Sequence, residues 1–171
     1  DRPLFGRRAL WVRSGPSYEP RRKLYASLKY GPRKSNDLTS QHGHVIGEFI
    51  HKSVDAGLKV YLQLGAAEPT GLPNEDRSRM PHGKIAEGRL ADTGSLASPD
   101  IRKYNRAYAR DLVAEYPQIS GFRIDWPESP CYTLGELFQD FSEHVASWAS
   151  TRGFDFELAQ RDTQALYDYL L

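Results

Sequence analysis

The chain of 171 residues lacks features on which several classes of protein depend. It has a single cysteine, Cys131, so no intrachain disulfide can form and a disulfide-stabilised scaffold is excluded. No apolar run approaches the roughly 20 residues that a membrane-spanning helix needs. The formal net charge is only +1, which gives no general reason to expect a nucleic-acid or membrane partner.

Motifs for several kinds of chemistry are also missing. No Gly-x-Gly-x-x-Gly or phosphate-binding loop occurs, which argues against a nucleotide cofactor. No Gly-x-Ser-x-Gly elbow occurs, and Cys131 has no recognisable base nearby. His42 and His44 are two residues apart, so they do not share a helix face as metal ligands would. We therefore expect neither a cofactor nor a metal, and a soluble protein of undetermined compartment without a visible signal peptide.

Aromatic residues, in contrast, are abundant. Ten tyrosines and three tryptophans accompany one methionine. Sugar-binding clefts use such aromatic surface, although the same residues also fill protein cores.

Strand and helix patterns alternate along the chain. Strands are expected at residues 9–13, 58–64 and 119–126. Helices are expected at 40–56, closed by Gly57, and at 98–116, with Ser98 as N-cap. Two more helices follow, one opened by a capping box at 133–136 and one capped by Asp155. A long polar loop, 65–97, separates the second strand from the second helix.

This order predicts parallel strands joined by helical crossovers. Each expected strand has one aliphatic face and one polar or aromatic face, which favours a barrel, because a flat sheet covered on both sides would have two aliphatic faces. A complete (β/α)8 barrel needs about 250 residues. We therefore expect a single α/β domain over 1–171 that forms the N-terminal half of a (β/α)8 TIM barrel, with about three βα units, as a fragment of a longer chain. A smaller α/β domain is the alternative.

The third strand ends in two carboxylates, Asp125 and Glu128, separated by Trp126 and a proline. The carboxyl ends of parallel strands are where active sites of α/β folds lie. Glycoside hydrolysis needs one carboxyl group as acid and a second as nucleophile or base, so this pair is the expected catalytic group. Alternatively, Asp125 only forms an ion pair with Arg123 or Arg13 and has a structural role.

Other residues at the ends of the expected strands are predicted to bind substrate. Tyr18 would offer a ring for stacking, and Glu68 would belong to the cleft or be a solvated charge. The full set of predicted substrate-binding residues is Arg13, Tyr18, Tyr61, Gln63, Glu68, Arg123 and Trp126.

Several segments together resemble a group of uncharacterised bacterial proteins that look like TIM barrels of the glycoside hydrolase type. They are 57–63 (GLKVYLQ), 94–99 (GSLASP), 110–112 (RDL), 116–117 (YP) and 121–128 (GFRIDWPE). The resemblance extends from about residue 43 to 169 and is more specific for the fold than for the activity.

This resemblance implies that the acid/base carboxylate follows the fourth strand of the barrel and that the nucleophile follows a later strand. If the strand at 119–126, the third recognised in this sequence, is that fourth strand, Asp125 or Glu128 matches the acid/base carboxylate by position. Proline precedes Glu128 where many such families have asparagine. The expected function is hydrolysis of a carbohydrate, with Glu128 as acid and Asp125 positioning it. This chain alone would be inactive and would need the rest of the barrel or a second copy as partner. The alternatives are a non-catalytic carbohydrate-binding barrel and a different barrel hydrolase or lyase.

Overall fold

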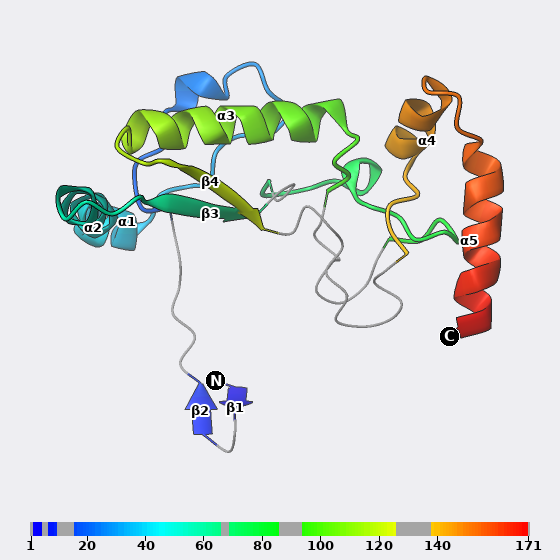
Figure 1. The fold of residues 1–171 in the computed structure, drawn as a ribbon, viewed down its shortest axis with the longest axis horizontal. Helices are drawn as coiled ribbons and strands as arrows, with labels where there is room; N and C mark the ends of the chain where they lie inside the picture. Colours follow the sequence, from blue (N-terminus) through cyan, green and yellow to red (C-terminus); the bar gives the residue numbers. More distant parts are fainter. Residues whose placement is uncertain are drawn as a thin grey trace.

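The computed structural model describes residues 2–4, 7–9, 16–65, 69–85, 94–125 and 138–170. These form a mixed α/β fold, as predicted, with a two-stranded parallel sheet and helices packed beside it (Figure 1). Whether the sheet belongs to a barrel stays a prediction.

The centre of the fold is one β-α-β unit. Strand β3 (Tyr61–Gly65) leads into helix α3 (Pro99–Glu115), which returns the chain to strand β4 (Gly121–Asp125). The two strands are parallel and in register from Tyr61 opposite Gly121 to Gly65 opposite Asp125. Both strands are shorter than predicted; β4 lies within the predicted range, whereas β3 starts later than predicted and ends one residue beyond its range.

Helix α3 forms where the sequence predicts it. The Ser98 side chain accepts a hydrogen bond from the Ile101 amide at 3.4 Å, and Pro99 fits the first turn because its missing N–H would have no partner there. The predicted apolar stripe is Ile101, Tyr104, Tyr108, Leu112 and Tyr116, and all five are buried or half-buried. Burial of each large aliphatic side chain in it contributes about 1.5 to 3 kcal/mol.

Before β3 the structure has two helices where the sequence predicts one. Helix α1 (Asp37–His42) and helix α2 (His44–Asp55) meet at Gly43. The apolar side chains of α2 are buried only in part: Ile50 is in the core, whereas Phe49 is 66% exposed. Gly57 closes α2 with φ +80°, as expected of a glycine C-cap.

The sheet has the predicted two different faces. Leu62, Leu64 and Phe122 point toward the helices and pack in one core cluster with Ile50 of α2 and Leu112 of α3. Helices α2 and α3 therefore contact the same face of the sheet. The opposite face carries the polar and aromatic side chains.

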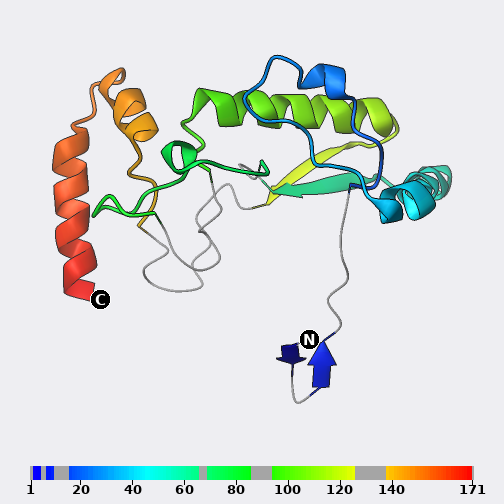
Figure 2. The ribbon, with the colours of Figure 1, turned by 180° about the vertical axis from the view of Figure 1, so that it is seen from behind.

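Segment 16–30 lies along α3 and contains the 3-10 helix η1 (Arg22–Leu24) (Figures 1 and 2). Tyr25 and Tyr30 pack on Tyr104 of α3 in a second core cluster. Asp111 of α3, with a fully buried side chain, accepts hydrogen bonds from the Tyr25 hydroxyl at 3.2 Å and from Arg21. This buried carboxylate ties the segment to the helix.

Of the last two helices, the first begins later than the sequence predicts and the second begins at its predicted cap. Helix α4 (Glu143–Ser150) starts after Ser142, so the prediction that a helix already covers 138–142 is wrong. The predicted capping box at 133–136 lies outside the described residues. Helix α5 (Phe156–Leu170) follows, and the Asp155 carboxylate accepts a bond from the Leu158 amide at 2.9 Å, which confirms that cap.

The N-terminal residues form an antiparallel hairpin that the sequence analysis did not predict. Strand β1 (Arg2–Leu4) pairs with strand β2 (Arg7–Ala9), away from the parallel sheet (Figures 1 and 2). The strand expected at 9–13 lies outside the described residues except for its first position, which belongs to β2. No helix in the described ranges has the length and apolarity needed to cross a bilayer.

Candidate functional site

The carboxyl edge of the β3–β4 sheet organises the candidate site. Because α3 runs antiparallel to both strands, its N-terminus at Ser98 lies at the same edge as the strand ends at Gly65 and Asp125. The loop after β3 contains the 3-10 helix η2 (Asn74–Asp76) and also lies beyond the strand ends (Figure 1). Ligands of open α/β sheets bind at this edge.

The structure brings part of the predicted site together. Tyr61, Gln63 and Arg123 lie on the exposed face of the sheet, and Gln63 is directly opposite Arg123 in the parallel register. Tyr61 is 57% exposed, so its ring is accessible. Asp125 is the last residue of β4. Its side chain, together with Arg13, Glu68, Trp126 and Glu128, lies outside the described residues.

The structure corrects the prediction that Tyr18 offers a ring for stacking on substrate. Its side chain is only 6% exposed and packs edge-on against Tyr116, with ring centroids 5.9 Å apart. The ring belongs to the core between α2, α3 and the sheet, so it is not available to stack on a sugar. An aromatic residue in a polar loop looks like a surface residue, but here the loop folds back over α3.

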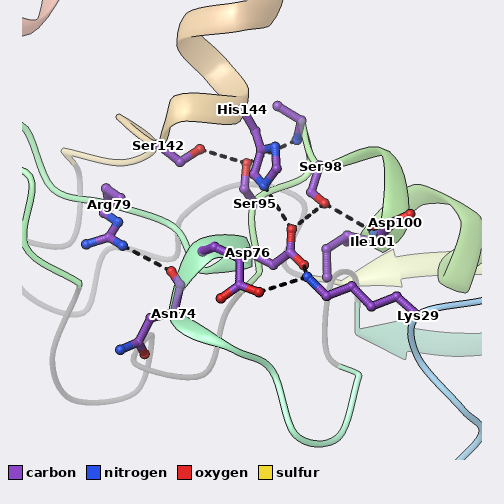
Figure 3. Close-up of polar contacts among 12 residues, drawn as sticks. Lys29, Asn74, Asp76, Arg79, Ser95, Ser98, Asp100, Ile101, Ser142 and His144 are labelled. Atoms are coloured by element: carbon purple, nitrogen blue, oxygen red, sulfur yellow. Dashed lines mark hydrogen bonds and ion pairs between the residues drawn. The ribbon is translucent and has the colours of Figure 1, made fainter.

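A cluster centred on Asp76 lies at this edge (Figure 3). The Asp76 carboxylate is 2% exposed and accepts hydrogen bonds from Lys29 Nζ at 2.6 Å and Ser98 Oγ at 2.7 Å. The Tyr30 hydroxyl donates to the same carboxylate, and His144 Nε2 lies 2.8 Å from Oδ1. The carboxylate therefore joins segment 16–30, the start of α3 and the start of α4.

These contacts fix the charge of the centre. Burial acts to raise the pKa of Asp76, but the hydrogen bonds from Lys29, Tyr30 and Ser98 outweigh it and hold that pKa well below its usual range. The bond to Asp76 likewise raises the pKa of Lys29. An ionised carboxylate only accepts hydrogen bonds, so His144 donates from Nε2.

A second group of hydrogen bonds connects the loop after β3 to the segment before α4. Ser142 Oγ donates to Ser95 Oγ at 3.0 Å, and both side chains are buried. The Asp140 carboxylate accepts from the Arg79 amide at 3.1 Å and the Ser142 amide at 2.8 Å. Two loops far apart in the sequence are thus held together at the edge of the sheet.

A pocket of about 410 Å³ opens beside this cluster, within the size range of small-molecule sites. It is lined by Glu75, Arg79, Gly83, Phe141, Glu143, Ala146, Phe156 and Gln160. The rings of Phe141 and Phe156 are 5.9 Å apart between centroids. Arg79 and Gln160 are held by the carbonyls of Gly83 and Pro81, at 3.0 and 2.7 Å. The pocket lining is therefore partly fixed. Its carboxylates can accept hydrogen bonds from hydroxyl groups of a ligand, and its rings can contact the ligand's apolar faces.

No pattern in the sequence indicates this cluster or this pocket. Asp76 and Glu75 stand in a polar loop where every carboxylate looks solvated, and nothing in the sequence distinguishes His144 from an ordinary surface residue of a helix. His144 is instead 28% exposed and in contact with a buried charge. Of the residues that form this cluster, only Ser98 is recognisable from the sequence, as the N-cap of a helix.

Within the ranges that the structure describes, no group of three or more His, Cys, Asp or Glu side chains is arranged to hold a metal ion. Comparison of the chain with protein-family models, with curated proteins and with solved structures finds no match.

Proposed function

We propose that this chain forms part of a (β/α)8 barrel related to glycoside hydrolases and hydrolyses a carbohydrate at the carboxyl edge of its strands. The observation that carries this proposal is the two-faced β3–β4 sheet. Helices α2 and α3 both contact its aliphatic face, and Tyr61, Gln63 and Arg123 occupy the other. A barrel has helices only outside and polar groups near its mouth, whereas a doubly wound sheet has helices on both faces.

The proposed chemistry uses the carboxylates at the end of β4. Glu128 protonates the oxygen of the leaving sugar, and Asp125 positions either Glu128 or the substrate. A carboxylate from a later strand, beyond this chain, acts as nucleophile or base. Asp125 as the last residue of β4 supports this proposal, because the chain after it starts at the edge where α3 begins.

The test is the variant Glu128→Gln in the full-length protein that contains this chain. We expect it to keep the wild-type fold and to lose turnover by a factor of about 10² to 10⁴, the usual contribution of a general acid. The measurement is release of reducing sugar from a panel of oligosaccharides and aryl glycosides.

Glu48→Gln is the matched control, because Glu48 lies on the surface of α2 with a 60% exposed side chain. It should hydrolyse every substrate at the wild-type rate. Wild-type turnover in Glu128→Gln on every accepted glycoside would show that the acid assignment is wrong. Turnover that a chelator abolishes would favour a metal-dependent hydrolase instead.

The second candidate function is carbohydrate binding without catalysis. The pocket with Glu143 and Phe156 favours it, because carboxylates that can accept from hydroxyl groups and rings that can contact apolar faces line it together. Its test is calorimetric titration of the full chain with oligosaccharides. We expect Phe156→Ala to weaken binding and the exposed Phe154→Ala, outside the pocket, to leave it unchanged. Binding without hydrolysis by the full-length protein would favour this alternative, and equal effects of both variants would exclude the pocket.

A further inference from the structure

The segment before α1 concentrates positive charge. The whole chain has 23 basic and 22 acidic residues, yet residues 20–35 contain no acidic residue. The basic residues of this segment are Arg21, Arg22, Lys23, Lys29, Arg33 and Lys34. The net charge of the whole chain is therefore small although residues 20–35 carry a strong local excess of positive charge.

The fold neutralises Arg21 and Lys29 of this segment. Arg21 forms ion pairs with Asp111 at 3.2 Å and with Glu115 at 2.9 Å, and Lys29 pairs with Asp76 at 2.6 Å. In contrast, no carboxylate of the described residues lies within ion-pair distance of Arg22 or Lys34. The fold thus uses some cations of the segment for its own stability and leaves others at the surface.

Cations from both ends of the segment meet at one pocket. Arg22, Arg33 and Lys34 all line this pocket, which has a volume of about 420 Å³. Pro20 and Pro32 also line it, and their rings restrict the backbone. Cations that line one concave site raise the local concentration of anions.

The loop that carries Arg33 and Lys34 is anchored at both ends. Tyr30, before it, is 4% exposed in the core and donates its hydroxyl hydrogen to Asp76. Asn36, after it, caps α1 by accepting a bond from the Thr39 amide at 3.2 Å. A loop held in this way binds with less loss of conformational entropy than a free one.

A hydroxyl group in the lining has no partner. Ser35 lines the pocket, and its Oγ atom is buried without a hydrogen-bond partner in the part of the chain that the structure describes. Buried hydroxyl groups normally have partners, so rotation of the Ser35 side chain toward the pocket would let this hydroxyl group donate to a bound group. Glu19 also lines the pocket and would accept hydrogen bonds from hydroxyl groups, although it would repel a bare anion.

From these observations we propose that the pocket formed by Glu19, Arg22, Arg33, Lys34 and Ser35 binds a small molecule that carries both hydroxyl groups and a tetrahedral oxyanion, as a phosphate or sulfate ester. The Arg22 guanidinium group binds the oxyanion in a bidentate manner, Lys34 adds a point charge, and Ser35 donates a hydrogen bond. Glu19 binds the hydroxyl groups.

This site is separate from the carboxyl edge of the sheet. Arg21, between two pocket residues, contacts Asp111 and Glu115 in the C-terminal half of α3, whereas the candidate site lies at the N-terminus of that helix. The proposal therefore does not depend on the proposed hydrolase activity.

The test is calorimetric titration of the full chain at low ionic strength with inorganic phosphate, glucose 6-phosphate, glucose 6-sulfate and glucose. We expect saturable binding of the glucose esters and none of glucose. Arg22→Gln and Lys34→Gln should each weaken ester binding by about tenfold or more, because each removes a hydrogen bond between charged groups. The ester that binds more tightly shows whether the site prefers a phosphate or a sulfate.

Lys23→Gln is the matched control, since Lys23 is exposed and adjacent to Arg22 but does not line the pocket. It should change the affinity less than twofold. Thermal unfolding of each variant checks that the fold is intact. The proposal is overturned if no ester binds saturably, if glucose binds as tightly as its esters, or if Lys23→Gln weakens binding as much as Arg22→Gln.

Discussion

At the scale of single residues, two buried aspartates hold the described part of the molecule together. Asp76 and Asp111 both have side chains that are at most 2% exposed, and each accepts bonds from segment 16–30. A buried carboxylate is stable only when it is paired and hydrogen-bonded, so the folded chain keeps their partners in place. Neither position was distinguished in the sequence from an ordinary solvated acid.

We expect Asp76→Asn to lower the free energy of unfolding by about 3 kcal/mol, since it removes the charge that Lys29, Tyr30, Ser98 and His144 share. Urea denaturation at pH 7 measures this. Glu75→Gln is the control, because it removes only the exposed ion pair to the same lysine at 3.0 Å and should shift the urea midpoint much less. Equal midpoints for wild type and Asp76→Asn would contradict a stabilising role.

The buried Asp76 carboxylate also makes the stability of the folded chain depend on pH. The pKa of Asp76 is lower in the folded protein than in the unfolded chain, so the unfolded chain binds more protons as the pH falls. The stabilisation is complete above about pH 5 and is lost at lower pH, toward the folded pKa. We expect Asp76→Asn to flatten stability against pH in this acid range, as followed by urea midpoints. A variant curve parallel to that of the wild type would refute this.

At the scale of elements, α3 follows local rules, whereas the join between α1 and α2 follows from tertiary packing. A Cβ atom on Gly43 would lie 2.7 Å from the Ser17 carbonyl oxygen, on a distant part of the chain. Gly43 is therefore needed for the close approach of segment 16–18. Gly47 is different, because its added Cβ would meet only Tyr116 at an ordinary 3.7 Å.

These two glycines form a matched pair of variants. We expect Gly43→Ala to lower the melting temperature, because the Ser17 backbone must move. Gly47→Ala should raise stability by about 0.5 to 1 kcal/mol, the usual advantage of alanine over glycine inside a helix. Differential scanning calorimetry compares both with the wild type. If both variants shift the melting temperature upward, the packing argument at Gly43 is wrong.

At the scale of the whole molecule, the α4–α5 pair has its own small cluster of buried apolar residues. Met80 and Phe138 pack there with Tyr167, separate from the two clusters around α3. His144 and Ser142 provide the polar connection to the sheet edge. A unit with few buried apolar contacts opens at a lower free energy than the central core.

We therefore expect amides of α4 and α5 to exchange hydrogen faster than those of β3, β4 and α3. His144→Ala should accelerate exchange in α4 further and leave the sheet unchanged, as hydrogen-exchange mass spectrometry would detect. His51→Ala is the control, because His51 is 64% exposed on α2 and pairs with Asp55 of the same helix at 3.3 Å. Uniform exchange over all helices, or an equal effect of both variants, would show that the described residues unfold as one unit.

The sequence by itself determined the mixed α/β class, the parallel strands, the two different faces of the sheet and the boundaries of α3. These follow from periodicity and from local caps such as Ser98, which act over a few residues. Only the tertiary structure decided the burial of Tyr18, the centre at Asp76 and the meeting of Arg22 with Lys34. The physical reason is that burial and charge pairing depend on which distant segments pack together, and no local pattern in a polar loop encodes that.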